Sequence, residues 1–338
     1  MATSEIQEKA DAPHRESGNQ ANSSAVNEDE ARLSKLGYYQ ELKRIFGPYT
    51  NFCLTSSMVS TLLGIIPLYP FEIRSGGPVV MFWSWLIIGG LAILLGLSLA
   101  EIASTYPTMG ALYYWSYRMG GPEWGPFSSW LAGWTNLLGQ IAGVASGSYS
   151  GALITVEIIH LISGFHVNKL GVMGLNIIIL VLAGIVNSYA ETLLTTISYI
   201  SAVWQILGVI VIVVWMLIVN REHLQSASFV FLEDGYNNYT GFDSIPLVVL
   251  IGSLAAATTF TGYDTAAHIA EETTVSHIST PMSMMFSILN VWVLGLILIV
   301  GMNFCISDIA FLSSKNDDDS VSQGWCQNLT IQHKILKL

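Results

Sequence analysis

Charged residues are scarce in this 338-residue sequence, where Asp, Glu, Lys and Arg together make up only 11%. Ordinary soluble domains contain about 25% charged residues. Hydrophobic residues reach 52%, and the mean hydropathy is +0.53. The shortage of charge excludes an ordinary soluble globular protein and indicates several membrane-spanning segments.

Cysteine is also scarce, and its three residues form neither a CxxC pair nor a mixed Cys and His pattern. We therefore expect no disulfide framework, zinc site or thiol redox chemistry. The sequence also lacks the phosphate-binding pattern GxxxxGK[ST], a GxSxG nucleophile and an HExxH metal motif. The sequence therefore has none of the motifs that an ATP-driven pump or a membrane hydrolase needs, and we expect no enzyme activity, cofactor or metal.

Long apolar runs, in contrast, are abundant. Seven runs after residue 48 are long enough to cross a bilayer. They cover about 49–72, 79–104, 126–162, 170–188, 193–220, 246–270 and 283–306. The pattern predicts an all-α polytopic membrane protein with about seven transmembrane helices.

The two ends of the chain are polar and have few large aliphatic residues. Such segments cannot bury a core. We expect a disordered N-terminal tail at residues 1–48, a transmembrane domain at 49–306 and a polar C-terminal tail at 307–338. Acidic residues in the two tails account for most of the net charge of −11.

Basic residues predict the orientation in the membrane. Arg32, Lys35, Lys43 and Arg44 cluster just before the first run. Since short cytoplasmic segments are enriched in Lys and Arg, we expect a cytoplasmic N-terminus in the plasma membrane or an endomembrane. A seven-helix receptor normally has the opposite orientation, which disfavours a receptor.

Two runs contain helix-breaking residues at corresponding positions. Gly64, Pro67 and Pro70 interrupt the first run, and Gly252 and the Thr261-Gly262 pair interrupt the sixth. Interrupted helices in two halves of a chain are typical of inverted-repeat transporters, which bind substrate at the breaks. Alternatively, these residues only reflect the frequency of Pro and Gly in membrane helices.

Ionisable residues follow the second interruption. Asp264, His268, Glu271 and Glu272 share one face of a helix, because they are spaced by four, seven and eight. Membrane carboxylates usually face a cavity or a partner, so this face predicts a polar pathway. We expect Asp264 to cap the following half-helix, the alternative being a proton relay or a contact with a substrate amine.

His268 is either a gate or a packing residue. Glu271 and Glu272 are either a solvated helix end or gate partners. Asn136 and Gln140, four residues apart, are candidates to line the path or to bond between helices. Glu101 ends the second run before an aromatic interface anchor, with a cytoplasmic gate as the alternative.

Four longer motifs carry a specific resemblance. They are SGGP at 75–78, GLSLAEIASTYPTMGALYYW at 96–115, SSWLAGWTNLLGQ at 128–140 and FTGYDTAAHIAEET at 260–273. With them the chain resembles the amino acid, polyamine and organocation transporters, especially the branch of GABA permeases, plant bidirectional amino acid transporters and choline permeases. The resemblance implies a five-plus-five inverted-repeat fold, here incomplete because five of twelve spans are missing.

The resemblance also implies alternating-access transport of amino acids, such as GABA or neutral or cationic amino acids. The alternatives are a choline or polyamine permease, and a non-transporting sensor or partner fragment. The implied substrate-binding positions are Leu63, Gly64, Ile65, Phe260, Thr261, Gly262 and Tyr263, with Asp264 at their edge. The missing spans imply impaired transport, or a partner that supplies the remaining helices.

This chain departs from the family at the end of the first run. Pro70, Phe71 and Glu72 follow Tyr69, where relatives have small residues and glycine. Glu72 either selects cations or is an exposed interface charge. In some relatives a lysine in the fifth run places its ammonium group where others bind sodium, and this chain has no lysine there. As coupling ion we favour a proton over sodium.

Overall fold

The computed structural model describes residues 28 to 165, 167 to 189 and 191 to 306. Within these ranges the chain is helical apart from turns, connecting segments and two isolated bridges. Residues 1 to 27 and the predicted C-terminal tail lie outside the described residues. The all-α prediction is confirmed.

Five of the described helices are long and apolar enough to cross a bilayer. They are α5 (Gly77–Thr105), α6 (Ala111–Ser163), α7 (Lys169–Tyr189), α8 (Glu191–Val219) and α12 (Ser276–Phe304). At 1.5 Å per residue, a 29-residue helix such as α5 is about 44 Å long, which matches the full thickness of a bilayer. The chain is therefore an integral, multi-pass membrane protein.

The first predicted run folds as three short helices. They are α2 (Pro48–Met58), α3 (Thr61–Ile65) and α4 (Tyr69–Arg74). The turn between α3 and α4 contains Pro67, so the predicted interruption of this run is confirmed. A second break lies at Val59 and Ser60, where the sequence has no proline or glycine that would predict it.

The predicted interruption at Gly64 itself is wrong, because Leu63, Gly64 and Ile65 all lie in α3. Gly64 permits a close approach instead. A Cβ atom on this glycine would lie 2.8 Å from Oγ1 of Thr259 and closer still to its Cγ2. The first broken segment therefore touches the sixth at this glycine.

The sixth predicted run is also broken. It folds as α10 (Ile245–Thr259), α11 (Thr265–His268) and the 3₁₀ turn η2 (Ala270–Glu272). Between α10 and α11, Gly262 has φ 95°, a left-handed conformation that favours glycine. The predicted interruption at Thr261-Gly262 is confirmed, whereas the one at Gly252 is wrong. Gly252 is helical, and a Cβ there would collide with the carbonyl oxygen of Ser75.

The helix α6 begins at Ala111, before the predicted start at 126. It contains a kink at Gly121, where φ is 69° and ψ is −174°. Pro122 follows directly and restarts the helix, since a proline in the first turn has no N–H group to leave unpaired. Residues 111 to 120 form a separate arm, and the part after the kink is the long apolar helix.

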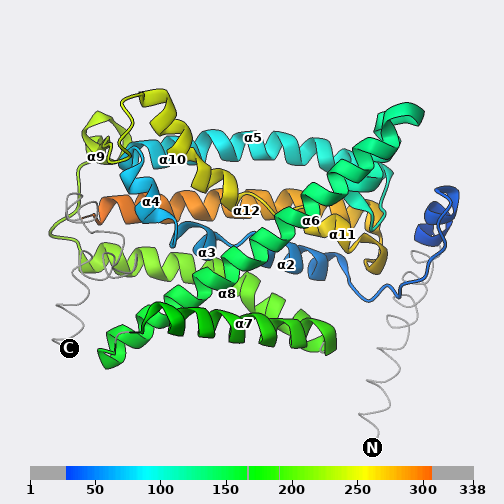
Figure 1. Cartoon of the computed structure of the whole chain (residues 1–338), viewed down its shortest axis with the longest axis horizontal. Helices are drawn as coiled ribbons and strands as arrows, with labels where there is room; N and C mark the ends of the chain where they lie inside the picture. The colour runs from blue at the N-terminus through cyan, green and yellow to red at the C-terminus, as the bar shows by residue number, and fades with distance from the viewer. Residues whose placement is uncertain (1–27, 166, 190, 307–338) are drawn as a thin grey trace, which may run out of the picture.

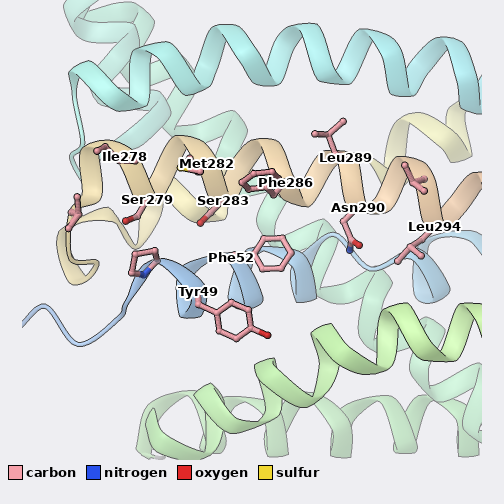
Figure 2. A pocket seen from close by; sticks show the side chains of 13 residues that line it. Tyr49, Phe52, Ile278, Ser279, Met282, Ser283, Phe286, Leu289, Asn290 and Leu294 are labelled. Atoms are coloured by element: carbon pink, nitrogen blue, oxygen red, sulfur yellow. The ribbon is translucent and has the colours of Figure 1, made fainter. Parts of the chain in front are cut away.

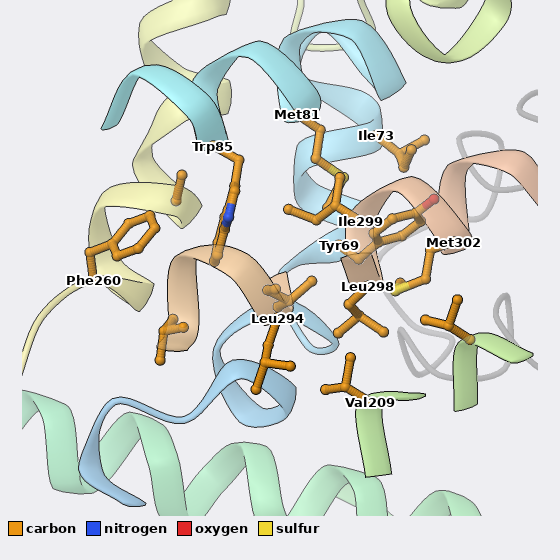
Figure 3. Close-up of a cluster of buried hydrophobic side chains, with 14 of the residues drawn as sticks. Tyr69, Ile73, Met81, Trp85, Val209, Phe260, Leu294, Leu298, Ile299 and Met302 are labelled. Atoms are coloured by element: carbon orange, nitrogen blue, oxygen red, sulfur yellow. The ribbon is translucent and has the colours of Figure 1, made fainter. Parts of the chain in front are cut away.

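α12 lies at the centre of the described helices and packs against α5, α2 and α8. Figure 3 shows its Leu298 and Leu294 among Trp85 and Met81 from α5 and Val209 from α8. The indole Nε1 of Trp85 donates a hydrogen bond to the carbonyl of Trp292, 2.9 Å away. The core therefore packs α12 against the long helices α5 and α8 and against α2 of the first broken segment.

Figure 1 separates two ends of the molecule. At the left, called here the α9 end, lie α4, the short α9 (Ala227–Phe231) and the 3₁₀ turn η1 (Glu233–Gly235). At the right, called the α11 end, lie α11, η2 and the connection between α5 and α6. The two broken segments connect these ends.

Residues 28 to 47 differ from the predicted disordered tail, because they pack onto the α11 end. Leu33 and Phe46 are buried. The amide of Phe46 donates to the carbonyl of Glu272, and the amide of Thr274 donates to the carbonyl of Phe46, both at 2.9 Å. This backbone pairing attaches the segment to the end of the sixth run.

Candidate functional site

The breaks of the first and sixth segments face each other. A Cβ atom built on Gly262 would lie 3.9 Å from both Met58 Cβ and Val59 Cγ2. The non-helical residues 59 and 60 therefore lie beside the non-helical stretch from 260 to 264. Two segments some 200 residues apart thus place irregular backbone at one point inside a helical membrane protein.

Backbone amides are available at this point. The N–H groups of residues 60 to 63 have no acceptor in the described part of the chain. They belong to the first turn of α3, where helix geometry leaves amides unpaired. Such amides favour a bound anion or carboxylate.

A buried polar network supports the first break from behind. Gln205 of α8 donates through Nε2 to the carbonyl of Val59 (3.1 Å) and to Oγ1 of Thr61 (2.9 Å). Its Oε1 accepts from Ser56, whose hydroxyl accepts in turn from Asn290 of α12 at 3.2 Å. No prediction from the sequence included this network, although single amides within apolar runs are a recognisable signal.

Phe260 lies against Trp85, with ring centroids 4.6 Å apart, and its side chain is only 3% exposed (Figure 3). It therefore packs in the core. Thr261 donates through Oγ1 to the carbonyl of Thr258, and Tyr263 is partly buried beside the break. Of the two aromatic rings, Tyr263 is the one left for contact with a ligand.

Asp264 stands at the start of α11, as expected for a capping residue, but its carboxylate does not cap the helix. Its Oδ2 lies 3.5 Å from Nε2 of His268, one turn further along. The predicted capping bond is therefore wrong. The carboxylate is directed along the four-residue helix toward the imidazole and away from the first amides.

His268 is the centre of a polar cluster that joins α6 to the sixth segment. Its Nε2 lies 3.2 Å from Nδ2 of Asn136, and its Nδ1 lies 3.4 Å from the carbonyl of Met109. Gln140 donates to Oδ1 of Asn136 at 3.5 Å. The structure thus brings together three of the predicted path-lining residues, which come from two distant segments.

The two predicted gate carboxylates lie in different places. Glu271 accepts a hydrogen bond from the amide of Met109 through Oε1 at 2.9 Å, so it links η2 to the connection before α6. Glu101 is exposed on α5, and its carboxylate has no partner among the described residues. Of the two, only Glu271 lies beside the His268 cluster, because both contact the backbone of Met109.

The N-terminal segment closes the same end with a buried ion pair. Arg44 lies 3.5 Å from Asp29, and the two side chains are only 2% and 1% exposed. The guanidinium also donates to the carbonyls of Ala270 and Thr273, which end the sixth run. Burial lowers the pKa of Arg44, and the nearby charge of Asp29 opposes that effect.

One hollow in the described part of the chain is separate from the facing breaks. A groove of about 810 Å³ lies between α2 and α12, and Figure 2 shows Tyr49 and Phe52 opposite Met282 and Phe286. Its lining is mostly apolar and includes no residue from 260 to 264. Such a groove suits an apolar helix or lipid chain better than a polar solute.

Several long apolar helices and two facing broken segments define the class: a multi-pass membrane protein with two interrupted helices, an arrangement typical of inverted-repeat transporters. Residues 46–323 match the family model described as amino acid permease. The chain belongs to this amino acid permease family. The family resemblance stated from the motifs is confirmed.

Curated relatives agree with the family assignment. The chain is 34% identical over 308 residues to an amino-acid permease, BAT1, of Arabidopsis thaliana, covering 89% of this chain and 59% of the relative. It is 36% identical to the BAT1 homolog of Oryza sativa subsp. japonica, with coverages of 85% and 56%. It is 28% identical to a GABA-specific permease of Saccharomyces cerevisiae, with coverages of 82% and 49%. The chain thus spans about half to three fifths of these relatives' lengths.

Proposed function

We propose that this chain forms the substrate-binding part of a secondary amino acid transporter that works by alternating access. The facing breaks at residues 59–60 and 260–264 carry the proposal, because they put unpaired backbone groups beside each other inside the bundle. The family membership and the name GABA-specific permease of one relative favour an amino acid substrate.

The chemistry of the breaks suits a zwitterion. A carboxylate fits the free amides of residues 60 to 63, with help from the positive end of α3. An ammonium group fits the carbonyls of the non-helical stretch before α11, where Tyr263 adds a partly buried aromatic ring. Gly262 keeps this stretch in its left-handed turn.

The α11 end is the proposed cytoplasmic side. Arg44, Arg32, Lys35 and Lys43 lie on or beside the segment that packs there, in agreement with the positive-inside rule. In the conformation described, His268, Asn136 and Glu271 join α6, α11 and η2 at this end. We assign this cluster to the inner gate, which must separate when substrate leaves toward the cytoplasm.

The groove between α2 and α12 is the proposed seat of an additional membrane helix. Its apolar side chains are exposed in the described structure, and burying them against another helix removes them from water and lipid headgroups. A partner that supplies an apolar helix would fill it. Transport by the chain alone is then weaker than transport by the assembled protein.

Ligand binding tests the proposal directly. The purified full chain is heated with a panel of neutral and cationic amino acids, GABA, choline and polyamines, and its melting temperature is followed. Stabilisation by amino acids, lost in Gly262→Ala but kept in Gly90→Ala, supports the proposed site, since only Gly262 needs a left-handed backbone. Stabilisation by choline or polyamines alone would replace the proposal with an amine permease, and no stabilisation by any compound would refute it.

A further inference from the structure

Glu72 is a buried carboxyl that the proposed substrate site does not use. It lies on α4 near the α9 end, and it is only 3% exposed. Tyr69 and Ile73 on the same helix belong to the apolar core (Figure 3). The sequence allowed an exposed interface charge at this position, and the burial excludes that interpretation.

No counter-ion accompanies this carboxyl. Within the described ranges, no Lys, Arg or His nitrogen lies within ion-pair distance of Glu72, and no side chain hydrogen-bonds to it. Asp29 is equally buried, but it has Arg44 as a partner. The two carboxyls therefore have different electrostatic environments.

The surroundings of Glu72 contain few other ionisable groups. Its own helix carries Tyr69 and Arg74, and neither forms an ion pair with it. Cys305 lies beyond the end of α12, and the loop paired with Ser75 carries further tyrosines at 236 and 239. The packed helix α10 has no ionisable residue, and α5 has only Glu101 near its opposite end.

Burial without a counter-ion favours a neutral carboxyl. An ionised carboxylate in such a place loses several kcal/mol of hydration energy, and adding a proton removes that cost. Glu72 therefore holds a proton when α4 is packed as in this structure, and it can release that proton when its helix becomes hydrated.

The helix that carries Glu72 is bounded by non-helical backbone on both sides. α4 has six residues, between the Pro67 turn and two consecutive glycines, Gly76 and Gly77, with φ of 109° and 74°. On its other side, α3 touches Thr259 through Gly64, next to the break of the sixth segment. α3 therefore connects α4 to the facing breaks.

We infer that Glu72 is the proton-binding group of this transporter, protonated while α4 is packed and deprotonated to water at the α9 end when α4 swings away. The proton comes from water and returns to water, so no other reactant is needed. The link to transport rests on the proposed function, whereas the protonation of Glu72 does not.

Dicyclohexylcarbodiimide, an apolar reagent that modifies protonated carboxyls, tests the protonation. The full chain in lipid nanodiscs is treated at about pH 7.5, where an ordinary carboxyl is ionised, and the adducts are located by peptide mass spectrometry. We expect modification of Glu72 at least about tenfold above that of the exposed Glu101, because only the buried group keeps its proton. Equal or absent modification of Glu72 would overturn the inference.

The variant Glu72→Gln supplies a second readout, because its amide has the same shape and never ionises. Between about pH 5.5 and 8.5 the wild type should lose thermal stability relative to this variant, because Glu72 ionises freely in the unfolded chain, whereas folding must return its proton or bury its charge. Glu101→Gln should follow the wild type throughout. An identical pH response of wild type and Glu72→Gln would contradict the inference.

The two proposals can fail separately. Strong modification of Glu72 in a chain that binds no ligand supports the proton-binding group and refutes the proposed substrate site. Ligand binding with an unmodified Glu72 supports the substrate site and refutes the proton-binding group.

Discussion

At the residue scale, glycine and small polar side chains decide how closely the broken segments approach. Gly64 lets α3 contact Thr259 of α10, and Gly262, with φ 95°, forms the turn that lies beside Met58 and Val59. Gln205 then satisfies the carbonyl that the first break leaves free. The proposed site is thus made of backbone, and side chains from neighbouring helices hold that backbone in position.

Gly64→Ala should destabilise the protein by about 1–3 kcal/mol, because the new methyl group overlaps the side chain of Thr259. Thermal unfolding of the purified chain measures the change. Gly90→Ala in α5 is the matched control, since a Cβ there meets nothing within 4 Å. The double variant Gly64→Ala/Thr259→Ala should recover part of the loss, and strict additivity of the two changes would show that these residues do not touch.

At the element scale, the segment at residues 28 to 47 acts as a strap over the α11 end. The strap pairs with Glu272 and Thr274 through Phe46, and Arg44 connects it to the last carbonyls of the sixth run. A buried ion pair of this kind is costly to break from one side, because the remaining charge has lost its partner. The strap therefore stays closed as long as both charges are present.

Arg44→Ala should open this strap, with a local loss of up to about 3–5 kcal/mol, since Asp29 loses its guanidinium partner and keeps only Nδ1 of His277, 3.5 Å away, as an ionisable neighbour. Hydrogen exchange of the peptides covering residues 28 to 47 reports the opening. Lys43→Ala is the matched control, because Lys43 is exposed and adjacent. Unchanged protection in Arg44→Ala would show that backbone pairing alone holds the strap.

At the scale of the whole molecule, the two ends differ in chemistry. Four basic residues of the strap, Arg32, Lys35, Lys43 and Arg44, lie at the α11 end, whereas Glu72, Arg74 and the connection around α9 lie at the other end. Since Lys and Arg are retained on the cytoplasmic side, this asymmetry sets the proposed orientation.

A cysteine-labelling experiment checks the orientation. In a Cys326→Ser background, Lys43→Cys should react with a membrane-impermeant maleimide only after the membrane is opened, and Asn238→Cys should react in intact cells or vesicles. Cys53 and Cys305 give little background because both are buried. The reverse pattern would invert the proposed topology and exchange the assignments of the inner and outer gates.

Parts of this architecture could be predicted from local sequence. The apolar runs predicted the long helices, because the cost of burying unpaired backbone in lipid leaves few alternatives to a helix. Pro67 and Gly262 predicted two interruptions, since both act through backbone geometry within one turn. The break at Val59 and Ser60 escaped prediction because it has no such residue and depends on Gln205 of α8.

The sequence by itself determined the membrane class, the two interrupted segments and the family, since each follows from local composition or a contiguous motif. Only the tertiary structure decided that Asn136 meets His268, that Phe260 packs on Trp85, and that Glu72 is buried without a counter-ion. These outcomes depend on contacts between residues far apart in the chain. Helix packing sets such contacts, and no local pattern encodes them.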